Sequence, residues 1–112
     1  MRFVPLFAAA LLAGCATAPK PAAAPPPAPG MERLLGQPVD SAIALLGPAS
    51  LDRREGAARQ LQFGGPCILD IFYYPKAGTG TVATYAEARL PDGRTFPAGE
   101  CLALLTRSKA AG

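Results

Sequence analysis

The chain of 112 residues contains no histidine and no tryptophan, and only 17% of its residues are charged. The absence of histidine excludes His-based acid–base chemistry and removes the commonest metal ligand. Residues 31–112 carry nine Lys and Arg against eight Asp and Glu, a balance that argues against a nucleic-acid partner. No apolar run reaches the about 20 residues that a membrane-spanning helix needs. The length leaves room for one small domain and excludes a multidomain enzyme.

The first residues are typical of a bacterial lipoprotein signal. A cation at Arg2 precedes an apolar stretch from Phe3 to Ala13, which ends in the sequence Leu12-Ala13-Gly14-Cys15. The length of the stretch suits the h-region of a signal peptide. The ending is similar to the lipobox, in which the thiol receives diacylglycerol and the chain is cut just before it. We therefore expect residues 1–14 to be a signal peptide and Cys15 to be the lipidation site; an ordinary secretory signal cut after Ala13 or Gly14 is the alternative.

The residue after Cys15 bears on the choice of membrane. In lipoproteins of enteric-type bacteria an Asp at this position favours the inner membrane, whereas this chain has Ala16. The resemblance implies an outer-membrane lipoprotein facing the periplasm. Stable anchoring takes two or more acyl chains, each buried CH₂ contributing about 0.8 kcal/mol.

Residues 16–30 have the composition of a tether. Twelve of these fifteen residues are Pro or Ala, so the segment has no hydrophobic face to bury. Pro-rich chain favours extended polyproline II at about 3.1 Å per residue, which corresponds to a reach of about 45 Å. We expect the lipidated Cys15 and this Ala/Pro-rich segment, residues 15–30, to act as a passive spacer; a ligand for a proline-recognition groove is the alternative.

The remaining residues, 31–112, are predicted to form a small periplasmic α+β domain. One helical turn is expected over 31–35, and Pro38 suits the first position of a helix that ends at Gly47-Pro48. Apolar residues recur at helical spacing in this helix and in a second one near the C-terminus, at Val39, Ala42, Ile43 and Leu46 and at Ala98, Cys101, Leu102 and Leu105.

The segment between the two helices has the alternation of an antiparallel sheet of three to four strands. Strands are expected over 50–54, 58–63, 67–74 and 81–90, with a loop over 75–80. The third of these is the strongest, because it is rich in β-branched and aromatic residues. Its alternation places Cys67, Leu69, Ile71 and Tyr73 on one face, and Ile68, Asp70, Phe72 and Tyr74 on the other.

The three cysteines have two predicted roles. With Cys15 assigned to lipid, Cys67 and Cys101 remain as a pair in an oxidising compartment. A disulfide between them would tie the C-terminal helix to the central strand and stabilise the domain by about 3–4 kcal/mol. A metal site is the alternative, but two thiols with no His supply only half of a tetrahedral set.

Part of the domain resembles a known family. Residues 34–74 are similar to the small outer-membrane lipoproteins of the SmpA/OmlA (BamE-like) type, and to short proteobacterial lipoproteins of unassigned function. The shared residues are Leu34-Leu35-Gly36, Ile43, Leu46-Gly47, Ala49, Arg53-x-Glu55-Gly56 and Leu61-Gln62-Phe63. The resemblance implies a helix followed by an antiparallel sheet and a role in outer-membrane assembly or integrity. The chain departs from the family in its early Pro48 and its C-terminal helix.

Three arginines form the densest cationic group. Arg53, Arg54 and Arg59 lie on the predicted hairpin, and guanidinium groups bind phosphate or carboxylate in a bidentate manner. Surface ion pairs worth 0–1 kcal/mol are the alternative. Asp70, in the middle of an apolar strand, must be paired if it is buried; it either faces solvent or accepts from Arg89.

Aromatic side chains offer a second candidate site. Tyr73, Tyr74 and Tyr85 would form an exposed patch for a partner, unless they serve core or cross-strand packing. No nucleophile–base pair, phosphate loop or metal set is evident in the sequence, so we predict neither enzymatic activity nor a cofactor. The sequence predicts a structural or protein-interaction module that binds the membrane through its anchor and other envelope proteins through its domain. A small ligand-binding protein or enzyme using Arg53, Arg59 and Asp70 is the alternative.

Overall fold

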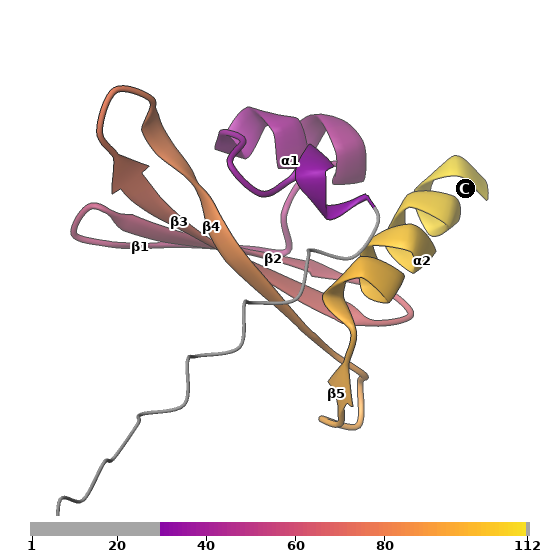
Figure 1. The fold of residues 1–112 in the computed structure, drawn as a ribbon. Coiled ribbons are helices and arrows are strands. Elements are labelled where there is room, and N and C mark those ends of the chain that lie inside the picture. Colours follow the sequence, from indigo (N-terminus) through magenta and orange to yellow (C-terminus); the bar gives the residue numbers. More distant parts are fainter. Residues whose placement is uncertain (1–29, 112) are drawn as a thin grey trace, which may run out of the picture.

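The computed structural model describes residues 30–111 as two helices packed on a five-stranded antiparallel sheet (Figure 1). Neighbouring strands in the sheet follow their order in the chain, so every connection is short. The elements are the 3₁₀ turn η1 (Met31–Arg33), α1 (Val39–Leu46), β1 (Leu51–Glu55), β2 (Ala58–Gly64), β3 (Ile68–Lys76), β4 (Gly80–Arg89), β5 (Thr95–Phe96) and α2 (Ala98–Ala111).

The predicted α+β class, the antiparallel sheet and the two helices are confirmed, with differences at the edges. The sheet has one strand more than expected, because the chain turns after Leu90 and Phe96 pairs with Ala88. The added strand β5 has only two residues, which is too few to show the alternation of polar and apolar residues that predicts a strand. The loop expected over 75–80 is shorter, since β3 runs on to Lys76 and pairs Pro75 with Thr81. Proline is tolerated there because the pairing of β2 with β3 ends at Tyr73.

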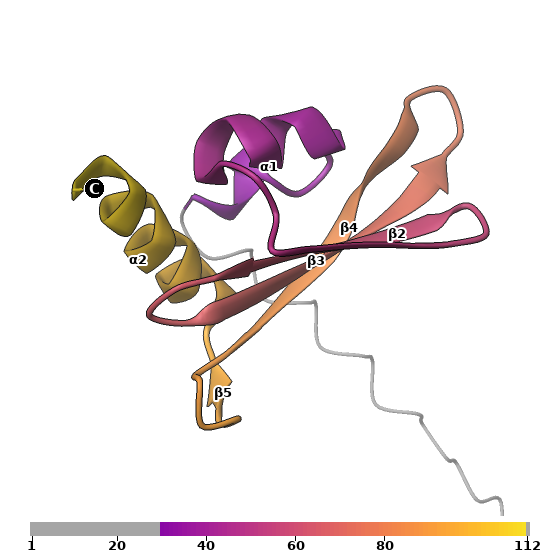
Figure 2. The ribbon, with the colours of Figure 1, turned by 180° about the vertical axis from the view of Figure 1, so that it is seen from behind.

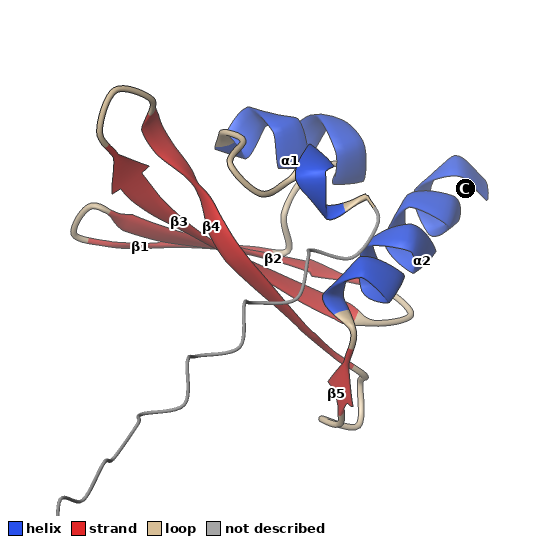
Figure 3. Cartoon of the chain, in the orientation of Figure 1, coloured by secondary structure: helices blue, strands red, loops and turns tan. Residues whose placement is uncertain are grey.

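Both helices lie on the same face of the sheet, as Figures 2 and 3 show. The side chains that alternate toward this face form the core: Leu61, Leu69, Ile71 and Tyr73 are 0% exposed. Ala42 of α1 and Leu102 and Leu105 of α2 are buried against them. The apolar stripes predicted for the two helices therefore point into the core, as the spacing requires.

Helix α1 is bounded by the two residues that the sequence suggests. Pro38 is the N-cap residue rather than the first helical residue, so α1 begins at Val39, one residue later than predicted. At the other end Gly47 has a φ of 81° and its N–H donates to the carbonyl of Ile43 at 2.8 Å. A positive φ is readily adopted by glycine, and this turn of the backbone ends the helix.

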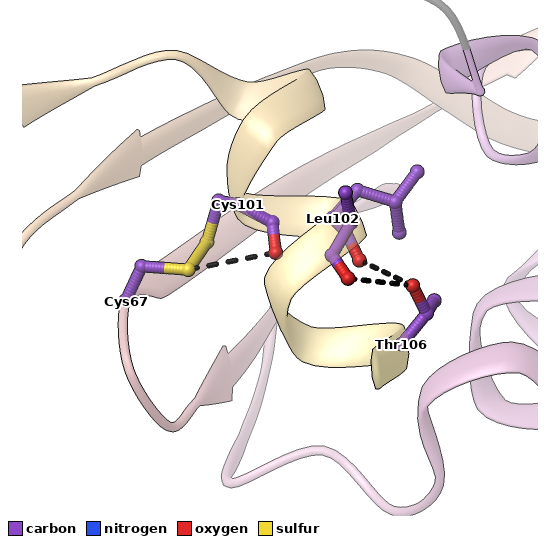
Figure 4. Close-up of a disulfide and its surroundings, with 5 residues drawn as sticks. Cys67, Cys101, Leu102 and Thr106 are labelled. Carbon is purple, nitrogen blue, oxygen red and sulfur yellow. Dashed lines mark hydrogen bonds between the residues drawn. A yellow bond between two sulfur atoms is a disulfide. The ribbon is translucent and has the colours of Figure 1, made fainter. Parts of the chain in front are cut away.

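The predicted disulfide joins Cys67, just before β3, to Cys101 in the first turn of α2 (Figure 4). The two Cα atoms lie 5.8 Å apart, and both side chains are 0% exposed. Next to the bridge, the backbone of Gly65 passes so close to α2 that a Cβ there would lie 3.0 Å from Leu105. The bridge therefore holds α2 closely against the turn between β2 and β3.

Candidate partner-binding face

The sheet face turned away from α1 and α2 is not covered by any element of residues 30–111 (Figures 1 and 2). We call it the open face. The register brings three aromatic side chains together on it, because Phe72 of β3 pairs with Tyr85 of β4 and Tyr74 follows two residues after Phe72. The ring centroids of Phe72 and Tyr85 lie 4.5 Å apart, and those of Tyr74 and Tyr85 lie 6.4 Å apart. We call this row of rings the aromatic ridge.

Much of the aromatic ridge is accessible to solvent. The exposed fraction is 40% for Tyr74 and 42% for Tyr85, large values for aromatic residues. The structure thus places both predicted residues side by side and adds Phe72. The alternation of β3 puts Phe72 and Tyr74 on one face, but only the register with β4 shows that Tyr85 stacks on them.

Tyr73 does not belong to this patch, which corrects the prediction for this residue. It points to the opposite face, is 0% exposed and lies in the core. Its hydroxyl finds no hydrogen-bond partner among the described residues. Burial raises the pKa of Tyr73 to about 12, because the phenolate loses its hydration inside the protein.

Asp70 lies on the open face beneath a polar network. It is only 4% exposed, and its carboxylate accepts hydrogen bonds from the side-chain amides of Gln60 at 3.0 Å and Gln62 at 2.8 Å. An ion pair with Arg89 completes the network, so of the two alternatives left open for Asp70 the structure shows the pairing with Arg89 and not the exposure to solvent. A buried charge needs such compensation. The network holds both glutamine side chains, of which Gln60 pairs with Phe72 of the aromatic ridge.

The three candidate arginines do not converge on one site. Arg53 pairs with Gln60, whose neighbour is Phe72, so Arg53 lies on the open face. Together with Glu55 and the aromatic ridge it borders a hollow of about 130 Å³. Arg59 also reaches the lining of this hollow, but its side chain is held by Asp52, so Arg53 is the unengaged arginine beside Tyr74 and Tyr85 among the described residues.

Arg54 and Arg59 belong to the other face. They pair with each other across the hairpin, and Arg59 pairs in turn with the buried Tyr73. Both border a cleft of about 360 Å³ beside Asp40 at the start of α1. Arg59 donates two hydrogen bonds to Asp52, at 2.8 and 2.6 Å, and these lower the pKa of the Asp52 carboxyl.

This arrangement does not support the predicted alternative site. Arg53 and Arg59 both border the small hollow beside the aromatic rings, but Asp70 lines a different cleft with Arg89, so the three predicted side chains do not meet in one pocket of the described residues. Asp70 and Arg59 are also already engaged in ion pairs. What the open face offers is a surface of aromatic rings flanked by hydrogen-bonding groups, which suits binding.

The described residues contain neither a group of three potential metal ligands nor a helix long and apolar enough to cross a membrane. The predicted lipidation site, Cys15, lies outside the described residues, as does the proline-rich segment up to residue 29. Comparisons with protein-family models, with curated protein sequences and with solved structures found no match to the chain.

The unpartnered hydroxyl of Tyr73 leads to a prediction for stability. The unfolded chain ionises Tyr73 near pH 10, while the folded protein keeps the proton until about pH 12. The contribution of Tyr73 to the free energy of unfolding is thus intact below pH 10 and lost between pH 10 and about 12. Tyr73→Phe should remove this loss and leave stability at pH 7 unchanged or slightly higher, since no hydrogen bond is broken.

Denaturant unfolding of the wild type, Tyr73→Phe and the exposed-site control Tyr85→Phe at pH 7 and pH 11 measures this effect. Between pH 7 and pH 11 the free energy of unfolding of the control should fall nearly as much as that of the wild type, whereas that of Tyr73→Phe should fall less. A loss of more than about 1 kcal/mol at pH 7 in Tyr73→Phe would show that the hydroxyl does make a hydrogen bond.

Proposed function

We propose that this protein is a lipid-anchored lipoprotein of the cell envelope whose small domain binds other envelope proteins through the aromatic ridge. The anchor is Cys15, residues 15–30 are the tether, and the domain faces the periplasm from the outer membrane. The observation that carries the proposal is the exposed row of stacked aromatic rings beside Arg53, on a sheet face that no described element covers.

The composition of the open face supports a protein partner. Tyr and Arg are enriched among the residues that dominate binding energy at protein interfaces. Tyr74, Tyr85 and Arg53 line the same hollow. Asp70 accepts a hydrogen bond from Gln60 and so holds it in a fixed orientation beside them. A prearranged side chain loses less entropy when a partner binds.

The position of the proposed anchor supports the same function. The lipobox-like sequence ending at Cys15 and the tether after it would hold the domain near the membrane with its open face accessible. We further propose a role in outer-membrane assembly or integrity, which the resemblance of residues 34–74 to SmpA/OmlA-type lipoproteins supports. A binding domain needs neither a cofactor nor catalytic residues, and we propose neither.

The anchor is tested by the variant Cys15→Ser. Because only a thiol forms the thioether to diacylglycerol, the variant should remain uncut and should take up no lipid. Growth with a clickable palmitate analogue measures lipid attachment, and intact mass measures processing. Label that persists in Cys15→Ser would contradict the anchor.

The binding face is tested by cross-linking in intact cells. We expect the wild type to give a specific cross-link to an envelope protein, and the double variant Tyr74→Ala/Tyr85→Ala to lose it. Leu51→Ala is the matched control, because Leu51 is 40% exposed and lies at the edge of the open face, away from the ridge. Equal cross-linking by the ridge variant and the control would exclude the ridge as the binding site.

A further inference from the structure

The sheet has two edges, and the described chain closes only one of them. Along β4 the segment before α1 lies against the edge: the N–H of Gly36 donates to the carbonyl of Ala83 at 2.8 Å, and the N–H of Ala83 donates to the carbonyl of Gln37 at 2.9 Å. Strand β5 then pairs with Ala88 and Arg89. The other edge is β1, whose residues are all exposed. It pairs with β2 alone, so no strand among residues 30–111 lies on its outer side.

The free backbone groups of this edge belong to Asp52 and Arg54. The carbonyl of Gln62 faces β1, because it accepts from the N–H of Ser50 at 2.8 Å. Backbone groups alternate between the two sides of a strand, so the register turns the odd-numbered residues of β1 toward β2 and the even-numbered ones outward. Asp52 and Arg54 each direct an N–H and a C=O away from the sheet. A row of such groups is a template for a further strand.

The edge lacks two of the devices that commonly block such pairing. β1 contains no proline, and its register with β2 runs from Leu51 to Glu55 without a bulge. Its charged residues have both signs, since Asp52 and Glu55 balance Arg53 and Arg54. Opposite charges directly across a strand pair stabilise it and like charges destabilise it. The order of the charges therefore selects the strand that can be added.

A second copy of β1 has the complementary order of charges. When two copies run antiparallel with Arg53 on a twofold axis, Asp52 of each copy lies opposite Arg54 of the other, and every outward N–H and C=O of β1 is paired. The symmetric registers centred on Asp52 or on Arg54 place that residue opposite its own copy, with like charges facing each other. They also leave the other outward residue without a partner in β1.

Arg53 lies opposite its own copy on the axis, and Glu55 offsets this repulsion. The diagonal neighbours of a cross-strand pair lie two residues away, within reach of long side chains. Each Arg53 therefore has Glu55 of the other copy as a diagonal neighbour on the open face. Neither Arg53 nor Glu55 forms an ion pair with any residue of 30–111, so both are available for this contact.

We propose that two copies of the chain pair through β1 around a twofold axis at Arg53 and so join their five-stranded sheets into one continuous sheet. A twofold axis between antiparallel edge strands is perpendicular to the sheet, so the helices of both copies lie on one side and both open faces lie on the other. The aromatic ridges of the two copies then face the same direction. The inference goes beyond the proposed function, because it requires neither the lipid anchor nor an envelope partner.

Cysteine cross-linking tests the pairing and its register in the purified full-length chain carrying Cys15→Ser. The native disulfide leaves an added cysteine as the only thiol. In the proposed dimer the two Cα atoms at position 53 lie about 4.5 Å apart, within the range that a disulfide bridges. Arg53→Cys should therefore give a disulfide-linked dimer on non-reducing gels after mild oxidation.

Two further cysteine variants serve as matched controls for the register. Glu55→Cys and Leu51→Cys lie on the same strand and the same face as position 53, but each lies far from its own copy in the proposed dimer. Neither should cross-link alone. A mixture of the two chains should form the mixed dimer, because positions 51 and 55 lie opposite each other.

An exchange of charges separates a specific pair from a random collision. In the Arg53→Cys chain, adding Arg54→Asp should abolish the dimer, because Asp52 then lies opposite a carboxylate. Adding Asp52→Arg as well should restore the dimer. Arg59, which lies opposite position 54, keeps a carboxylate partner in this exchanged chain.

Three results with the purified chain would overturn the dimer: no cross-link of Arg53→Cys at the highest soluble concentration, an equal yield from Glu55→Cys alone, or a yield that Arg54→Asp leaves unchanged. In intact cells, a link from Arg53→Cys to a different protein in place of its own copy would overturn it as well. The ridge variant Tyr74→Ala/Tyr85→Ala should leave the dimer unchanged, since these rings lie on β3 and β4. Failure of the dimer and failure of the proposed function are therefore detected by different variants.

Discussion

The disulfide between Cys67 and Cys101 determines which face of the sheet is covered. It fixes the first turn of α2 to the start of β3, across 34 residues of chain. In the chain-entropy model, closing a loop of this length stabilises the folded state by about 4 kcal/mol. A domain of about 80 residues has a total stability of the same order. The covalent tie therefore contributes a large part of the free energy that keeps α2 on the sheet.

The one-sided packing creates the candidate binding face. Residues of β3 that point toward α1 and α2, such as Leu69 and Ile71, are fully buried. The residues that alternate with them point to the open face, where Phe72 pairs with Tyr85 and Tyr74 pairs with Val82, and no helix among the described residues covers them (Figure 1). Asp70 is the exception on this side, since its buried charge is balanced by Arg89 and two glutamine amides. This network lets a carboxylate lie in the middle of the sheet while the surface around it stays ordered.

Much of the fold follows from local patterns in the sequence. The alternation from Cys67 to Tyr74 identifies the two faces of β3, and Gly47 and Gly56 mark the ends of α1 and β1 correctly. The strand β5 was not predicted, because two residues carry no periodicity and their pairing depends on the turn after Leu90. The observed start of α1 differs from the predicted start by one residue, because the φ of proline is compatible with both the N-cap and the first position of a helix.

The candidate site is harder to predict because it depends on contacts between strands. The sequence separates Arg53 from Arg54 by alternation, but it does not show that Arg59 lies on the side of Tyr73, away from Asp70. That arrangement is set by the register between β1, β2 and β3. The same register buries Tyr73 and exposes Tyr74. Side chains alternate between the two faces of a strand, so neighbouring tyrosines point to opposite faces. Which face is the core becomes clear only when the positions of the helices are known.

The disulfide underlies both the fold and the proposed location in an oxidising compartment, so the decisive measurement is the redox state of Cys67 and Cys101. The protein is taken from intact cells, alkylated after denaturation without reductant, and digested for mass spectrometry. We expect Cys67 and Cys101 to be recovered as linked peptides and neither of them to be alkylated. Recovery of both as alkylated free thiols would contradict this expectation, since α2 would then be held by packing alone and the compartment would not be oxidising.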